Sequence, residues 1–184
     1  MVYKPISDYG IIGNMVSAAL VAKDGSIDWC CLPRFDSPSI FAAILDDEKG
    51  GSFGIQPRVH FESSQFYLND TNVLQTVFQT ETGTVMLTDF MPCYQRADGR
   101  LVQFNEIHRI AECTHGEVDL KVTFQSKPEY ATVDPSLDIT KYGVVITGGG
   151  THISLSSPVP FKALGDQATA TVKLRRSVIF CGTG

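Results

Sequence analysis

A strict alternation of apolar and polar residues is the feature that most constrains the fold of this chain. In residues 117–125, EVDLKVTFQ, the apolar side chains are Val118, Leu120, Val122 and Phe124, and polar residues separate them. Successive side chains of a β-strand point to opposite faces, so this period of two predicts a strand with one buried and one solvated face. Such strands are typical of antiparallel sheets. Residues 169–175 and 151–156 repeat the pattern.

Short polar or glycine-containing segments separate the predicted strands. They are residues 23–26 (KDGS), 81–83 (ETG), 115–116 (HG) and 148–150 (GGG). Glycine supplies the positive φ that tight hairpin turns require. Strands with such frequent turns favour an antiparallel sandwich or barrel. The 184 residues suffice for one domain with a sizeable core, and no linker divides them. The chain is therefore predicted to be a single all-β domain over residues 1–184.

One segment carries the signals of a helix. Ser37 is a good N-cap, Pro38 suits the first helical position, and the apolar run SIFAAIL follows. Gly50 and Gly51 would end the helix. The sequence thus predicts one short helix near residues 38–46.

Composition and motifs exclude several classes of function. The net charge is -5 and no basic run occurs, so nucleic acid is not an expected partner. No apolar run approaches the ~20 residues of a membrane-spanning helix, and the N-terminus lacks a signal pattern, so no membrane association is expected. The five cysteines are odd in number and scattered, which fits reduced thiols in a cytoplasmic protein. The four histidines share no ligand spacing, so neither a metal nor a cofactor is predicted.

The candidate site is the stretch DWCCLPRFD, residues 28–36. It contains Trp29, the only tryptophan, and Arg34 and Asp36, which flank Phe35. One interpretation is structural, with an Arg34–Asp36 salt bridge that pins the loop. The other is that Trp29, Arg34 and Asp36 face a sugar, whose C–H surface suits an aromatic ring and whose hydroxyls suit charged groups. The residues alone leave both interpretations open.

The chain resembles the N-terminal domain of the glycoside hydrolase family 15 enzymes, which include bacterial and archaeal glucoamylases and trehalases. The resemblance rests on residues 3–14, 18–53 and 67–92, and more faintly on 106–131. Its most specific part is DGSIDW…LPRFDSPS…F…LD within residues 24–46. It implies a super-β-sandwich followed by a catalytic (α/α)₆ barrel that lies downstream of residue 184. It also implies an inverting reaction by two glutamates of that barrel, so no catalytic residue is assigned to this chain.

Three hypotheses follow from the resemblance. In the favoured one, the chain is a non-catalytic domain that packs on the barrel of its parent enzyme, with Trp29, Arg34, Phe35 and Asp36 at the domain interface or the substrate rim. The parent is expected to be a glucoamylase (glucan 1,4-α-glucosidase) acting on α-glucosides, with a trehalase acting on trehalose as a close second. The alternatives are a carbohydrate-binding module and an oligomerisation domain that forms a homo-oligomer. Fold analogy alone supports the binding module.

Overall fold

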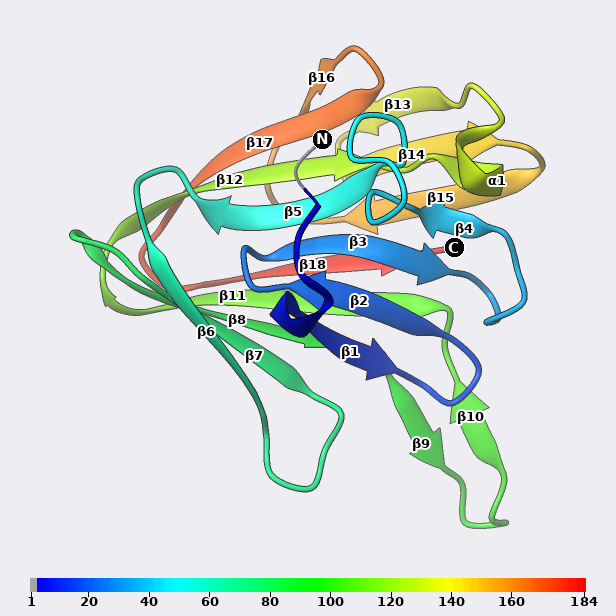
Figure 1. The fold of residues 1–184 in the computed structure, drawn as a ribbon, viewed down its shortest axis with the longest axis horizontal. Coiled ribbons are helices and arrows are strands. Elements are labelled where there is room, and N and C mark those ends of the chain that lie inside the picture. The colour runs from blue at the N-terminus through cyan, green and yellow to red at the C-terminus, as the bar shows by residue number, and fades with distance from the viewer. Residues whose placement is uncertain (1–2) are drawn as a thin grey trace.

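The protein is a sandwich of two antiparallel β-sheets. A computed structural model describes residues 3–184, in which two eight-stranded sheets pack face to face (Figure 1). The prediction of an all-β sandwich is confirmed. The described helical elements are the single-turn η1 (Ile6–Asp8) and α1 (Pro128–Ala131). No helix in this part of the chain is long and apolar enough to cross a membrane.

The first sheet faces the viewer in Figure 1 and has the order β1-β2-β3-β5-β12-β17-β16, with β4 paired to β3. Its strands are β1 (Tyr9–Gly13), β2 (Ala18–Ala22), β3 (Ser26–Cys31), β4 (Ser39–Phe41), β5 (Ser52–Pro57), β12 (Val118–Gln125), β16 (Lys162–Leu164) and β17 (Gln167–Leu174).

The second sheet lies behind the first and has the order β13-β14-β15-β18-β11-β8-β7-β6. Its strands are β6 (Glu62–Tyr67), β7 (Leu74–Gln79), β8 (Gly83–Phe90), β11 (Glu106–Gly116), β13 (Ser136–Thr140), β14 (Gly143–Gly148), β15 (Thr151–Ser156) and β18 (Ser177–Thr183). A separate hairpin, β9 (Cys93–Gln95) and β10 (Leu101–Gln103), projects from the sandwich (Figure 1).

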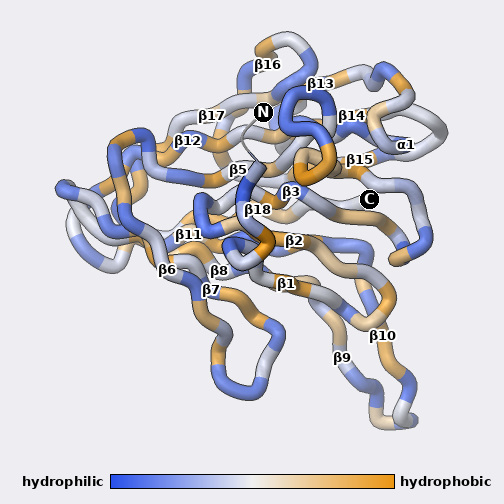
Figure 2. Tube along the Cα trace, viewed as in Figure 1, coloured by the Kyte–Doolittle hydropathy of each residue, from blue (hydrophilic) through white to orange (hydrophobic). Residues whose placement is uncertain are grey.

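Alternating burial produces the core. The four apolar residues predicted to face inward in β12 are all buried, and the same alternation occurs along β8. The hydropathy of the chain changes from residue to residue along these strands (Figure 2). The inward side chains of both sheets form one hydrophobic cluster between them.

Three of the four predicted turns join neighbouring antiparallel strands. Residues 23–26 connect β2 to β3, residues 81–83 connect β7 to β8, and residues 149–150 connect β14 to β15. The interpretation of residues 115–116 as hairpin punctuation is wrong. They lead from β11 in the second sheet to β12 in the first, so the chain crosses between the sheets there.

The predicted helix near residues 38–46 is also wrong. Ser39, Ile40 and Phe41 form β4, which pairs with β3, and all three are buried. A turn then follows, with hydrogen bonds from the Leu45 and Asp46 N–H groups to the Ala42 carbonyl. A short apolar run cannot distinguish a buried strand from a buried helix by its periodicity. Pairing with β3 therefore outweighs the local capping signal.

A buried ion pair lies in the second sheet, and its arginine also bonds to the first sheet. Arg109 on β11 and Asp89 on β8 are both fully buried, and the Arg109 Nε lies 2.8 Å from the Asp89 Oδ1. Arg109 also donates to the carbonyl groups of Phe53 and Gly25, which belong to the first sheet and its β2–β3 turn. Its guanidinium lies 4.7 Å from the centre of the Phe53 ring. Every charge of this pair is thus matched by a partner within the core.

Candidate functional site

The predicted site residues Arg34, Phe35 and Asp36 lie in the exposed loop between β3 and β4. The Arg34 Nε and the Asp36 Oδ1 are 3.0 Å apart, so the predicted pairing is present. Their side chains are 71% and 75% exposed, and an ion pair in water contributes little stability. The loop is closed locally, since the Ser37 Oγ accepts from the Arg34 N–H and the Ser37 N–H donates to the Arg34 carbonyl. Phe35 is 61% exposed between the two charges.

Trp29 lies on β3 and is half-buried on the outer face of the first sheet. Its ring centre is 6.3 Å from that of Tyr130 in α1. Residues 129–131 adopt left-handed backbone conformations, with φ of 55°, 56° and 60°. Such conformations cost about 1–2 kcal/mol each for residues other than glycine. The strained turn therefore presents Tyr130 to Trp29, a pairing that no sequence pattern indicated.

Three loops meet at one end of the sandwich, which we call the loop end: residues 13–17, 32–38 and 91–105. The Phe35 N–H donates to the Val16 carbonyl at 2.9 Å, and the Asn14 Nδ2 donates to the Phe104 carbonyl at 2.8 Å. Gly184 reaches the same end, where its N–H bonds to the Asn105 carbonyl at 3.2 Å. In Figure 1 these segments lie at the right and the lower right.

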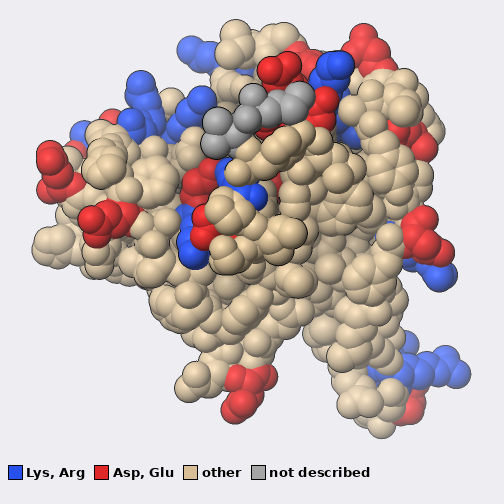
Figure 3. All heavy atoms as spheres, viewed as in Figure 1, with Lys and Arg blue, Asp and Glu red and all other residues tan. Residues whose placement is uncertain are grey.

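The loop end exposes several large apolar side chains. Met15 is 75% exposed, and Phe35, Tyr94 and Phe104 are exposed as well. The rings of Tyr94 and Phe104 stack with centres 6.1 Å apart. Figure 3 shows a broad uncharged area over much of β1 to β3, with charged side chains near η1 and the β2–β3 turn and at projecting tips. An exposed apolar patch with a polar rim is typical of a protein–protein contact surface.

The motif DGSIDW has a structural explanation. The Asp28 carboxylate is almost fully buried and accepts hydrogen bonds from Lys4 and Tyr9, each at 2.8 Å, and from Ser26. Burial lowers the pKa of Lys4, but its contacts with Asp24 and Asp28 outweigh burial, so that the pKa is raised. Burial and the bond to Asp28 raise the pKa of Tyr9. A cavity of about 180 Å³ adjoins these groups. The motif thus ties the N-terminal segment to β3.

Among residues 3–184, the structure brings together one group of metal-ligating side chains. The spacing of these residues in the sequence did not reveal the group. Glu106, His108 and Cys181 bring one donor atom each within 4.8 Å of one another. Burial raises the pKa of the Cys181 thiol, and the Glu106 carboxylate raises it further. Cys181 is distant in the sequence from the other two, so only the pairing of β11 with β18 unites them.

Comparison with known proteins gives consistent results. The family model described as "Trehalase-like, N-terminal" matches residues 2–181. A trehalase of Thermoplasma volcanium is 35% identical over 176 residues, which are 94% of this chain and 28% of that protein. A trehalase of Thermoplasma acidophilum is 35% identical over 159 residues, 84% of this chain and 27% of the relative. A trehalase of Mycolicibacterium smegmatis is 39% identical over 88 residues, 47% of this chain and 13% of the relative.

The chain therefore spans little more than a quarter of the length of the Thermoplasma relatives. Its match to the family model, by contrast, extends over nearly every residue. This chain belongs to the family of trehalase-like N-terminal domains.

Proposed function

We propose that the chain is the non-catalytic domain of a trehalose-hydrolysing enzyme of glycoside hydrolase family 15 and packs on its catalytic (α/α)₆ barrel. The observation that carries the proposal is the family match over residues 2–181, together with relatives that are several times longer. Those relatives are named trehalases, which favours trehalose over the α-1,4-glucans first expected from the sequence. The two glutamates that the family resemblance implies in the barrel would perform the inversion. An inverting pair needs about 6.5–9.5 Å between its carboxylates, so that a water molecule fits between them and the sugar.

The loop end is the surface that we assign to the barrel. Phe35 and Met15 offer apolar area, and the Arg34–Asp36 pair supplies a polar border beside Phe35. Trp29, with Tyr130, would extend the contact onto the outer face of the first sheet. This arrangement matches the anatomy of interfaces, in which apolar anchors are surrounded by polar groups.

All five cysteines are free, which supports a reducing, cytoplasmic location.

The first prediction concerns where the activity lies. We expect the 184-residue chain alone to release no glucose from trehalose or maltose. We expect a chimera, in which it replaces the matching 176 residues of the Thermoplasma volcanium trehalase, to hydrolyse trehalose. The same relative shortened by that region should lose activity or solubility, because the docking face of its barrel would be exposed. Glucose release, measured with each sugar, checks all three statements.

Hydrolysis of either sugar by the chain alone would overturn the non-catalytic assignment. A chimera that hydrolyses neither sugar, although it is folded, would contradict the proposed packing of this domain on the barrel. Calorimetric titration of the isolated chain with trehalose and maltooligosaccharides tests the first alternative. Heat of binding would favour a carbohydrate-binding module. A dimer in sedimentation, unchanged in the chimera, would instead favour an oligomerisation domain.

The second prediction concerns the loop end. In the chimera, Phe35→Asp should lower the trehalose-hydrolysing activity by about tenfold or more, because it places a charge in the apolar part of the contact. The matched control is Leu164→Asp on β16, a side chain of similar exposure (67% against 61%) outside the loop end. Both variants of the isolated chain should unfold at the wild-type urea concentration. Equal activity of the two chimeric variants would contradict the assigned interface.

A further inference from the structure

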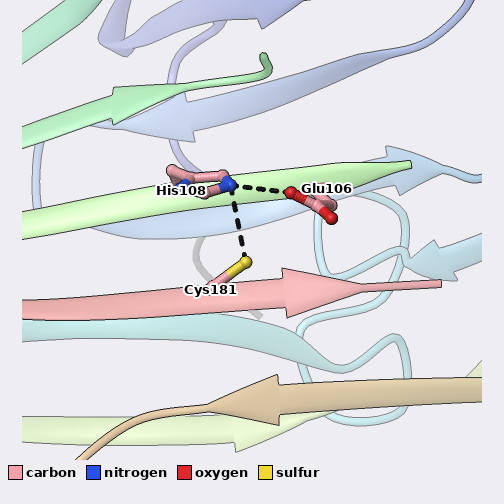
Figure 4. Close-up of side chains that lie close together, drawn as sticks. All are labelled: Glu106, His108 and Cys181. Carbon is pink, nitrogen blue, oxygen red and sulfur yellow. Dashed lines mark hydrogen bonds and ion pairs between the residues drawn. The ribbon is translucent and has the colours of Figure 1, made fainter. Parts of the chain in front are cut away.

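The outer face of the second sheet carries the cluster of Glu106, His108 and Cys181, which the proposed function does not use (Figure 4). In β11, Ile107 and Arg109 face the core, so Glu106 and His108 share the outer face. Cys181 is the cross-strand partner of His108 in the β11–β18 register. Directly opposed residues in antiparallel strands have neighbouring side chains. The fold therefore fixes all three groups from regular strands.

The donor atoms converge on one nitrogen. The His108 Nε2 lies 2.9 Å from the Glu106 Oε2 and 3.5 Å from the Cys181 Sγ. Figure 4 shows both contacts meeting at this atom. A nucleophile–base–acid triad requires the nucleophile and the acid at different ring nitrogens, so that the acid orients the base. Two partners at a single nitrogen do not fit a triad, whereas three donor atoms within 4.8 Å of one another fit a ligand set.

The separations suit a tetrahedral ion. A zinc ion bound at about 2.3 Å to sulfur and about 2.0–2.1 Å to nitrogen and oxygen places its ligand atoms roughly 3.3–3.6 Å apart. The Cys181–His108 distance of 3.5 Å already has this value. The Glu106–His108 distance of 2.9 Å must widen by about half an ångström. Both side chains are partly exposed, at 33% and 27%, and the flexible glutamate can supply this movement.

Neighbouring residues hold the cluster and leave it accessible. The Phe90 ring stacks on His108 with centres 5.2 Å apart and planes 24° apart, which fixes the imidazole plane. Cys181 also lines a shallow surface hollow with Tyr142 and Ile179, so solvent reaches the sulfur side. A site with three protein ligands and one water is the usual arrangement of zinc ions that keep an open position.

We propose that Glu106, His108 and Cys181 bind a zinc ion on the outer face of the second sheet. The donor set selects the metal. A thiolate with an imidazole favours zinc, whereas magnesium and calcium prefer oxygen ligands alone. The site is independent of the trehalase-like assignment, because it rests only on the register of β11 with β18.

Cobalt(II) is the probe for the test, because it replaces zinc and absorbs light when a thiolate binds it. The 184-residue chain is treated with a chelator, dialysed and titrated with cobalt(II). We expect a sulfur-to-cobalt charge-transfer band that saturates at one equivalent and disappears on addition of one equivalent of zinc. Cys181→Ser and His108→Gln should abolish the band. The matched controls Cys93→Ser and His60→Gln, at exposed positions outside the cluster, should retain it.

A second measurement needs no variant. Zinc should slow the alkylation of Cys181 by about tenfold or more, because a zinc-bound thiolate is not free to attack the alkylating reagent. Peptide mass spectrometry measures the rate. Alkylation of Cys93 in the same sample should not change. A wild-type chain without the band, a band that survives in Cys181→Ser, or unprotected Cys181 would each overturn the proposal.

Discussion

Replacing Arg109 by methionine is expected to lower the free energy of unfolding by about 3–5 kcal/mol, because it leaves the Asp89 carboxylate buried without a counter-charge. Both side chains are fully buried in the native protein. The substitution also removes the hydrogen bonds that Arg109 donates to the carbonyls of Phe53 and Gly25. The Gly25 carbonyl keeps its hydrogen bond from the Ile55 N–H at 3.1 Å, whereas Asp89 loses the charge that balances its own. Urea unfolding of the 184-residue chain measures the change.

Arg34→Met is the matched control, because it removes the same kind of group from an exposed ion pair. It should change the stability by at most about 1 kcal/mol. The double variant Arg109→Met with Asp89→Leu should be more stable than Arg109→Met alone, since an apolar pair leaves no buried charge. A double variant as unstable as the sum of its single changes would show that the ion pair is not the source of the loss.

The strands were predictable wherever one face of a strand is buried and the other is wet. Residues 117–125 and 169–175 satisfy this condition, and both are strands of the first sheet. Residues 39–41 do not satisfy it, because β4 is buried on both faces and shows no alternation. Its capping signals, Ser37 and Pro38, are local and favour a helix, whereas its pairing with β3 is a tertiary contact. The sequence could not weigh one against the other.

The buried ion pair was missed although a signal for it exists. Arg109 has the parity of Ile107 and Ala111 in β11, and Asp89 has the parity of Leu87 in β8. A charged residue at an inward position of a strand requires an internal partner. The partner could not be identified without the β11–β8 register, which places Arg109 opposite Asp89.

The candidate site was predicted in part. Arg34 and Asp36 pair as expected from their spacing, because both flank one residue of a short loop. Their roles at an interface or substrate rim remain predictions. The partner of Trp29 could not be anticipated, since Tyr130 is 101 positions away and reaches it through a strained turn. The Glu106–His108–Cys181 cluster was equally hidden, because β18 brings Cys181 back beside β11.

Gly25→Ala is expected to destabilise the chain by about 2–4 kcal/mol, for two separable reasons. Gly25 has a φ of 83°, a conformation that costs alanine about 1–2 kcal/mol. An added Cβ would also lie 2.2 Å from the Ile55 carbonyl oxygen and 2.9 Å from the Phe78 ring. Gly99 is the matched control, because its φ is 82° and, among the described residues beyond its two chain neighbours, no atom lies within 4 Å of an added Cβ. Gly99→Ala should therefore cost only the conformational part.

The cost of Gly25→Ala is also expected to depend on Arg109. Relief of the clash must move the Gly25 backbone, whose carbonyl accepts the Arg109 Nη2 hydrogen bond at 2.8 Å. In Arg109→Met that bond is already lost, so Gly25→Ala should cost less there than in the wild-type chain. Urea unfolding of the wild type, Gly25→Ala, Arg109→Met and the double variant of these two gives the coupling free energy directly. Additive losses would show that the β2–β3 turn and the buried arginine do not stabilise the sandwich as one unit. Equal losses for Gly25→Ala and Gly99→Ala would show that the contact with the Ile55 carbonyl adds nothing to the conformational cost.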